Sequence, residues 1–170
     1  TANLIDNTIT NNTVGIAVGY DASDTAVVTA TGNTFTDNEY PVSAQNTGNI
    51  NLENFLADNT IDKAVSIDGI YVLYSSIQEA INDAPVGGTV NVAAGTYNEE
   101  NIRITKGITL QGAGAETTFI APSTATNNST IVVQNPTGNV TIDGFNFVMQ
   151  PKPNYGSAVV VTGTGIGIDA

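Results

Sequence analysis

The sequence predicts an all-β fold, a parallel β-solenoid that contains one short helix at about residues 75–84. Three observations support this prediction. Residues 1–67 contain an Asn-rich internal repeat, residues 88–170 contain many short strands with alternating apolar residues, and a single amphipathic segment lies between them. In a solenoid each repeat buries its apolar face against its neighbours, so short strands in steady succession are its expected signature.

An internal repeat organises the first 67 residues. Its template is an apolar residue or Thr, then Asn two positions later, an apolar residue two further on, and Asn at the end. The copies align at residues 5–12, 31–38 and 52–59. Asn7 and Asn33 are 26 residues apart and Asn33 and Asn54 are 21 apart, which fits solenoid rungs with loops of variable length.

Stacked rungs place equivalent positions over one another at about 4.8 Å. The amides at two corners can then bond along the stack, because Asn carries both a donor and an acceptor. The first expected ladder is Asn7, Asn33 and Asn54, and the second is Asn12, Asn38 and Asn59. The expected interior apolar column is Ile9, Phe35 and Leu56. The alternative is three unrelated Asn-rich turns in a β-sandwich.

Residues 68–87 are predicted as a linker followed by a capping helix. Ile77, Ala80 and Ile81 follow the i, i+3, i+4 spacing of one apolar helix face, which Ala84 continues. Ser75 or Ser76 is the expected N-cap, and Pro85 with the following Gly pair ends the helix.

Residues 88–170 are predicted as further rungs. Apolar residues alternate with polar ones in segments such as TVNV, NIRI, TIVV and NVTI. The longest loop, at 149–157, contains two prolines, which cannot continue a strand ladder. We expect this loop to protrude, with Lys152 and Tyr155 at its tip.

The two ends of the sequence read into one another. The final segment, which contains Ile166 and Ile168, continues without a break into the first segment, which contains Ile5, and GIGIDA resembles residues 15–22. We therefore expect the rung order 88–170 followed by 1–67, within one chain or between copies, in a unit cut from a longer repeating protein. Ile5, Ile166 and Ile168 belong to this expected assembly surface.

Composition excludes several function classes. The net charge is −12, with 4 basic and 16 acidic residues, so nucleic acid is not an expected partner. The chain has no Cys and no His, which excludes a disulfide framework and a thiolate metal site. No apolar run is long enough for a membrane span. Structural Ca²⁺ is the one cofactor considered; the oxygen donors would come from Asp21, Asp24, Asp37, Glu39, Asp58 and Asp62.

Residues 76–114 read SIQEAINDAPVGGTVNVAAGTYNEENIRITKGITLQGAG. This stretch resembles the opening of the pectin-lyase-like, single-stranded right-handed parallel β-helix superfamily, which includes cell-surface repeat proteins. The resemblance implies a right-handed coil whose first turn is plugged by the amphipathic helix. It leaves function open, because the same scaffold carries lyases, hydrolases, esterases and non-catalytic surface proteins.

The catalytic patterns of these relatives are incomplete here. Residues 95–99, Gly-Thr-Tyr-Asn-Glu, match the Gly-x-Tyr-x-Glu segment of pectin methylesterases, but their later catalytic segments have no counterpart. A hydrolase needs paired carboxylates, and a lyase needs a base beside a Ca²⁺ site. No acidic cluster accompanies Arg103 and Lys106 on a matching rung, and we expect Arg103 to point outward and pair with a surface acid.

We therefore expect a non-enzymatic structural role. The chain would be an extracellular or cell-surface β-helix unit that stacks head-to-tail with copies of itself into a filament, stalk or adhesin array. The alternative is a β-helix that binds or cleaves polysaccharide, with its site near the 149–157 loop.

Overall fold

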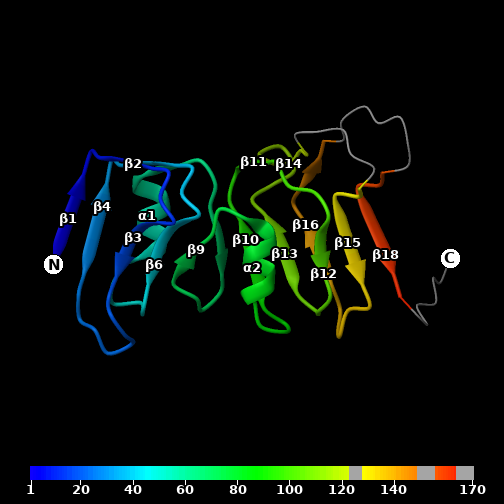
Figure 1. Cartoon of the computed structure of the whole chain (residues 1–170), viewed down its shortest axis with the longest axis horizontal. Helices are drawn as coiled ribbons and strands as arrows, with labels where there is room; N and C mark the ends of the chain where they lie inside the picture. The colour runs from blue at the N-terminus through cyan, green and yellow to red at the C-terminus, as the bar shows by residue number, and fades with distance from the viewer. Residues whose placement is uncertain (123–127, 149–155, 164–170) are drawn as a thin grey trace. The chain divides into compact units, whose positions relative to one another are not determined.

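The protein is a parallel β-solenoid, as the sequence predicts. The computed structural model describes residues 1–122, 128–148 and 156–163. The chain divides into two compact units, Thr1–Ser76 (unit 1) and Ile77–Ala170 (unit 2). Within the described residues, each unit consists of stacked coils of short strands and contains one short helix (Figure 1). The boundary falls inside the predicted linker and cap at 68–87, while the predicted rung order stays a prediction.

Unit 1 contains three coils. The first coil consists of β1 (Ala2–Ile5), β2 (Thr8–Thr10) and β3 (Val14–Val18). The second coil consists of β4 (Val28–Thr31), β5 (Thr34–Thr36) and β6 (Tyr40–Ala44). The third coil consists of α1 (Leu52–Asp58), β7 (Thr60–Ile61), β8 (Val65–Ile67) and β9 (Val72–Leu73).

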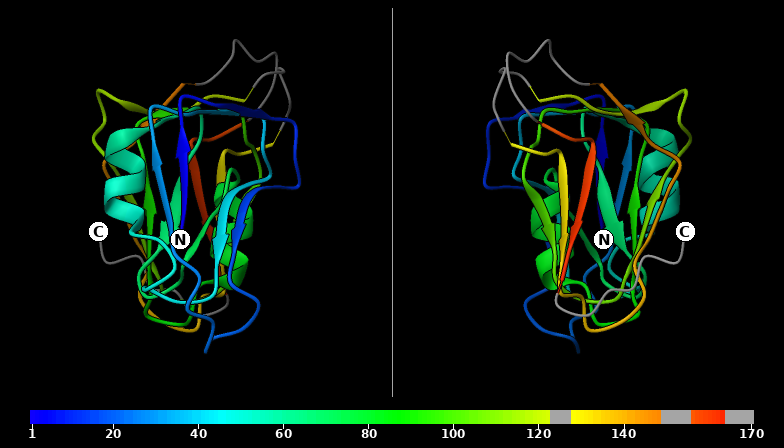
Figure 2. Two further views of the ribbon diagram at one scale, coloured as in Figure 1. Left: turned by 90° about the vertical axis from the view of Figure 1, so that its left-hand side faces the viewer. Right: turned by 90° about the vertical axis from the view of Figure 1, so that its right-hand side faces the viewer.

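The register between the first two coils is uniform. β1 pairs with β4, β2 with β5 and β3 with β6, all parallel, as in Ala2 with Val28, Ile9 with Phe35 and Ile16 with Val42. Each of these partners lies 26 residues further along the chain. Seen from the first coil, in the left view of Figure 2, the chain of unit 1 turns clockwise as it recedes, which is a right-handed coil.

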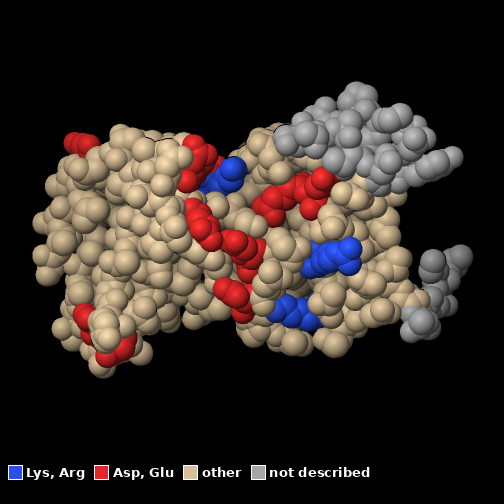
Figure 3. Space-filling model, viewed as in Figure 1, with Lys and Arg blue, Asp and Glu red and all other residues tan. Residues whose placement is uncertain are grey.

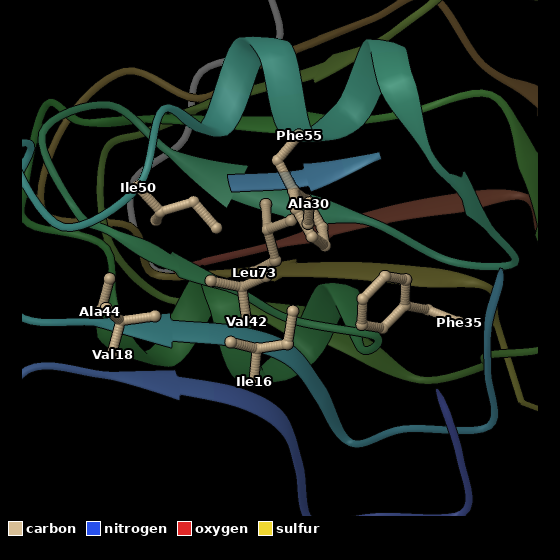
Figure 4. Close-up of a cluster of buried hydrophobic side chains, with 9 residues drawn as sticks. All are labelled: Ile16, Val18, Ala30, Phe35, Val42, Ala44, Ile50, Phe55 and Leu73. Carbon is tan, nitrogen blue, oxygen red and sulfur yellow. The ribbon is translucent and has the colours of Figure 1, made fainter. Parts of the chain in front are cut away.

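The core of unit 1 fills the inside of these coils (Figure 4). Phe35 and Phe55 meet edge-on with ring centroids 5.0 Å apart. Val42 and Leu73 are both fully buried. Small β-branched and aliphatic side chains therefore fill a narrow interior, with the Phe35–Phe55 pair as its bulkiest contact.

The third coil breaks the parallel pattern. α1 takes the place of a strand beside β4, and Asn51 caps it by accepting a hydrogen bond from the Asn54 backbone N–H at 2.8 Å. β9 pairs antiparallel with β6, and Val65 and Tyr74 bridge the turn between β8 and β9. Gly69, with φ +81, permits this turn. At these two sheets, the helix and the reversed strand do not present the template that a further parallel strand needs.

Unit 2 begins with a helix, and its described residues continue with three coils. Its helix is α2 (Ile77–Asp83), and its first coil consists of β10 (Thr89–Val92), β11 (Gly95–Tyr97) and β12 (Ile102–Ile104). The second coil consists of β13 (Thr109–Gly112), β14 (Thr118–Ile120) and β15 (Ile131–Gln134). The last described coil consists of β16 (Thr141–Asp143), β17 (Asn146–Phe147) and β18 (Val159–Thr162). The three parallel sheets run β10–β13–β16, β11–β14–β17 and β12–β15–β18.

α2 covers the edge of β12, as the predicted capping helix should. Ile77, Ala80 and Ile81 are buried on its inner face. The Gln78 side chain imitates a strand, because its Oε1 accepts from the Arg103 N–H at 2.6 Å and its Nε2 donates to the Arg103 carbonyl at 3.2 Å. The carboxylate of Glu99 accepts from the N–H groups of Ile77 and Gln78, which neutralises the helix N-terminus.

Neither helix in the described part of the chain is long and apolar enough to cross a membrane.

The interior position of Phe35 gives a stability prediction. We expect Phe35→Ala to lower the free energy of unfolding of unit 1 by about 3–5 kcal/mol, because it removes a 1% exposed ring and leaves a cavity beside Phe55. Thr10→Ala, on the exposed outer face of β2, is the control and should change it by less than about 0.5 kcal/mol. Urea unfolding followed by circular dichroism measures both. Similar losses in the two variants would contradict the interior assignment.

Candidate functional site

One Asn ladder runs through the corner between the first two sheets of unit 1. The Asn33 Oδ1 accepts from both the backbone N–H and the Nδ2 of Asn7, each at 2.9 Å. The Asn59 Oδ1 accepts in the same way from Asn33, at 2.9 and 2.8 Å. Each side chain thus satisfies the backbone of the coil before it. The donor groups of Asn33 also reach the carbonyls of Leu4 and Thr31, so this 1% exposed amide is fully bonded.

A second ladder runs through the next corner. The Asn38 Oδ1 accepts from the backbone N–H of Asn12 at 3.1 Å and from its Nδ2 at 3.0 Å. The Asn38 Nδ2 donates to the carbonyls of Ile9 and Thr36. The predicted pairings of Asn7 with Asn33 and of Asn12 with Asn38 are confirmed. Two Asn corners therefore fix the same 26-residue register independently.

The predicted third members of the ladders are wrong. Asn54 lies on the exposed face of α1, and Asn59 occupies the first ladder, not the second. Leu56 also lies on α1, and Ile61 continues the column of Ile9 and Phe35. The segment that stacks on residues 31–38 is 57–64, which lies five positions beyond the predicted copy at 52–59. The missed signal was local: Asn51 begins a helix, and Leu52, Phe55 and Leu56 follow its i, i+3, i+4 spacing.

The first coil of unit 1 has an open edge. Among the described residues, β1, β2 and β3 each pair on one side only, with the second coil. The acceptors Asn7 Oδ1 and Asn12 Oδ1 accept no hydrogen bond within that part of the chain, and both side chains are exposed. Leu4 and Ile9 are half-buried, whereas Ala30 and Phe35, their partners in the second coil, are buried. Within the described residues, this edge therefore presents unpaired parallel strands and a partly exposed interior column.

The last described coil of unit 2 also has apolar side chains that are more exposed than their partners in the coil before it. Val159 and Val161 align with Ile131 and Val133, which are 0% and 5% exposed. Val159 and Val161 are 37% and 59% exposed. Interior positions are thus left open at this coil too.

Of the other three residues of the predicted assembly surface, the structure describes Ile5. Ile5 is at the end of β1 with its side chain 62% exposed, so Leu4 and not Ile5 enters the interior. Ile166 and Ile168 lie outside the described residues, as do Lys152 and Tyr155.

Three of the six acidic residues considered for Ca²⁺ accept hydrogen bonds through their carboxylates: Asp21, Asp24 and Asp62. Asp21 accepts from the side chain and backbone N–H of Ser23, and these two hydrogen bonds lower the pKa of the Asp21 carboxyl. Asp24 accepts from the N–H groups of Tyr20 and Ala26, and Asp62 accepts from Asp37 and Lys63. No group of three or more metal-ligating side chains occurs among the described residues, and Ca²⁺ binding stays a prediction.

Two residues of the esterase-like segment, Tyr97 and Glu99, have structural contacts. Tyr97 is fully buried and its hydroxyl donates to the Ala93 carbonyl at 3.1 Å. Glu99 caps α2. Arg103 points outward, as predicted, but its Nη1 donates to the Gln134 side chain at 3.2 Å instead of pairing with an acid. On the face shown in Figure 3, basic side chains form isolated patches and neutral surface predominates.

No protein-family model, curated protein or solved structure matches the chain.

The buried ladder gives a matched pair of variants. We expect Asn33→Ala to lower the free energy of unfolding by about 1–3 kcal/mol, because it leaves the Asn7 N–H without its acceptor and removes one of the two donors to the Asn59 Oδ1. Asn54→Ala should change it by less than about 0.5 kcal/mol, because Asn54 is exposed on α1. Urea unfolding midpoints compare the two directly, and equal losses would contradict the observed ladder.

Proposed function

We propose that the chain is a structural β-solenoid module of an extracellular or cell-surface protein, and that it assembles head-to-tail with copies of itself. The observation that carries this proposal is the open edge of the first coil. Its interior column and its two Asn acceptors repeat those of the coil beneath, and its three strands are paired on one side only within the described residues. An uncapped parallel edge recruits further strands.

The position of the caps supports a direction for assembly. In unit 1, α1 and the antiparallel β9 close two sheets at the third coil, on the side away from the open edge. In unit 2, α2 closes the β12 edge before the first coil. Within the described residues, each unit therefore has one modified end and one plain end. A heterologous contact between the plain ends is head-to-tail, and it runs on into a filament if it does not close.

The contacts of the esterase-like segment favour a structural role over an enzymatic one. Tyr97 packs in the core and Glu99 holds the helix N-terminus, so both residues have a purpose in the fold. A fold-level resemblance by itself does not establish chemistry.

A groove in unit 1 favours polysaccharide binding as the second candidate. It has a volume of about 470 Å³ and lies between α1 and residues 66–71, with Glu53, Asp68 and Tyr71 in its lining. Carboxylates beside an aromatic ring suit sugar hydroxyls and an apolar sugar face. Isothermal titration with neutral β-glucan and mannan tests this candidate. Glu53→Gln should weaken binding if the groove is the site, and equal binding by both proteins would locate the sugar elsewhere.

Electron microscopy of the purified chain tests the assembly proposal. We expect wild-type protein to form long particles, and Ile9→Asp to prevent them, because the charge would lie at the buried centre of the junction. Thr10→Asp places the same charge on the outer face of β2 and should still assemble. Folding of both variants is checked by circular dichroism. Monodisperse small particles of wild-type protein, or filaments of a folded Ile9→Asp variant, would contradict the proposal.

A further inference from the structure

The two plain ends share one corner geometry. In unit 1, β1 and β2 are joined by two residues, and the first of them, Asp6, has φ +55. The same position in the second coil is Gly32, with φ +70. In unit 2, β16 and β17 are also joined by two residues, and the first of them, Gly144, has φ +79. Three coils thus turn through the left-handed region at the same point, and this gives a common reference for alignment.

We propose that the junction between copies has a single register, in which Gly144 of one copy stacks on Asp6 of the next. This inference rests on the proposed head-to-tail assembly and specifies its partner surface. β16 then pairs with β1, and β17 pairs with β2, both parallel. Phe145 lies over Asn7, and Asn146 lies over Thr8.

The apolar pattern agrees with this register independently. Ile142 falls on Leu4, and Phe147 falls on Ile9. All four side chains are half-buried, whereas their partners within their own units, Leu110, Ala30, Ile120 and Phe35, are buried. A slip by one residue would turn each of these side chains to the opposite face, so the buried interior requires this alignment or one shifted by an even number.

The corner hydrogen bonds select among the even shifts. Inside unit 1 an Asn Oδ1 accepts the backbone N–H of the corner residue one coil earlier, as Asn33 accepts from Asn7 at 2.9 Å. In the proposed register Phe145 is that earlier residue, and its N–H meets the Asn7 Oδ1. Phe145 has no side-chain amide to add, so the junction keeps the backbone bond and lacks the side-chain bond of the internal ladder. A shift by two residues would lose the backbone bond to the Asn7 Oδ1 as well.

Cysteine cross-linking tests the register without background, because the chain contains no Cys. Thr8 and Asn146 are both exposed on outward-facing positions. Parallel neighbours lie about 4.8 Å apart, which is within the Cα range of a disulfide. Under mild oxidation, the double variant Thr8→Cys with Asn146→Cys should give a covalent ladder of dimers, trimers and longer oligomers that collapses on reduction.

The matched control is Thr10→Cys with Asn146→Cys. In the proposed register Asn146 lies over Thr8, so these two cysteines are two residues out of register. The offset of about 6.6 Å along the strand puts the two Cα atoms beyond disulfide reach, so no ladder should form. A ladder in this control, or none in the Thr8 variant, would overturn the register. Dimers from Thr8→Cys alone would show two first coils meeting head-to-head, and a closed monomer would show stacking within one chain; both overturn the inference.

Electron microscopy of the same samples after reduction tests head-to-tail assembly separately from the register of the junction. Filaments without the expected cross-link would refute the register and leave head-to-tail assembly standing. Small particles together with no cross-link would refute both.

Discussion

The parallel hydrogen bonding between coils at a fixed 26-residue offset is the constraint on which unit 1 depends. The buried inner face of these strands excludes a slip by one residue but does not by itself exclude a slip by an even number. The Asn corners remove that freedom, because each Oδ1 accepts both a backbone and a side-chain N–H of the residue 26 positions earlier. Once the corners are fixed, Ile9 must meet Phe35 and Ile16 must meet Val42, and the narrow core forms from small side chains.

The same repetition leaves unpaired backbone groups at the two ends of a stack, where a further coil can bind. A middle coil satisfies its backbone groups on both sides, whereas an end coil exposes half of them together with its interior column. The chain closes some ends with local devices: Asn51 and α1 beside β4, a reversed β9 beside β6, and Gln78 on α2 beside β12. The first coil of unit 1 carries no such device among its described residues. The contrast between closed and plain ends is why we infer directional assembly.

Much of this organisation was predictable from the sequence, and the exceptions have physical causes. The period-2 strands, the apolar stripe of α2 and the pairing of Asn7 with Asn33 follow from spacing alone. The third repeat was misplaced because 52–59 matches the Asn template by chance while Asn51 starts a helix there. The capping of α2 by Glu99, 21 residues beyond Gln78, joins residues distant in sequence, and no local pattern identifies it. For Asn59, a strict 26-residue period would have sufficed.

Hydrogen exchange measured by NMR at the backbone amides of Asn7 and Asn12 tests the register most directly. Both residues are exposed, so neither amide would be protected by burial. The account predicts slow exchange at both, because each N–H donates to the side chain of Asn33 or Asn38. It also predicts that Asn33→Ala restores fast exchange at Asn7 and leaves Asn12 protected. Exchange at the unfolded-chain rate at both amides of the folded wild-type protein would contradict the account.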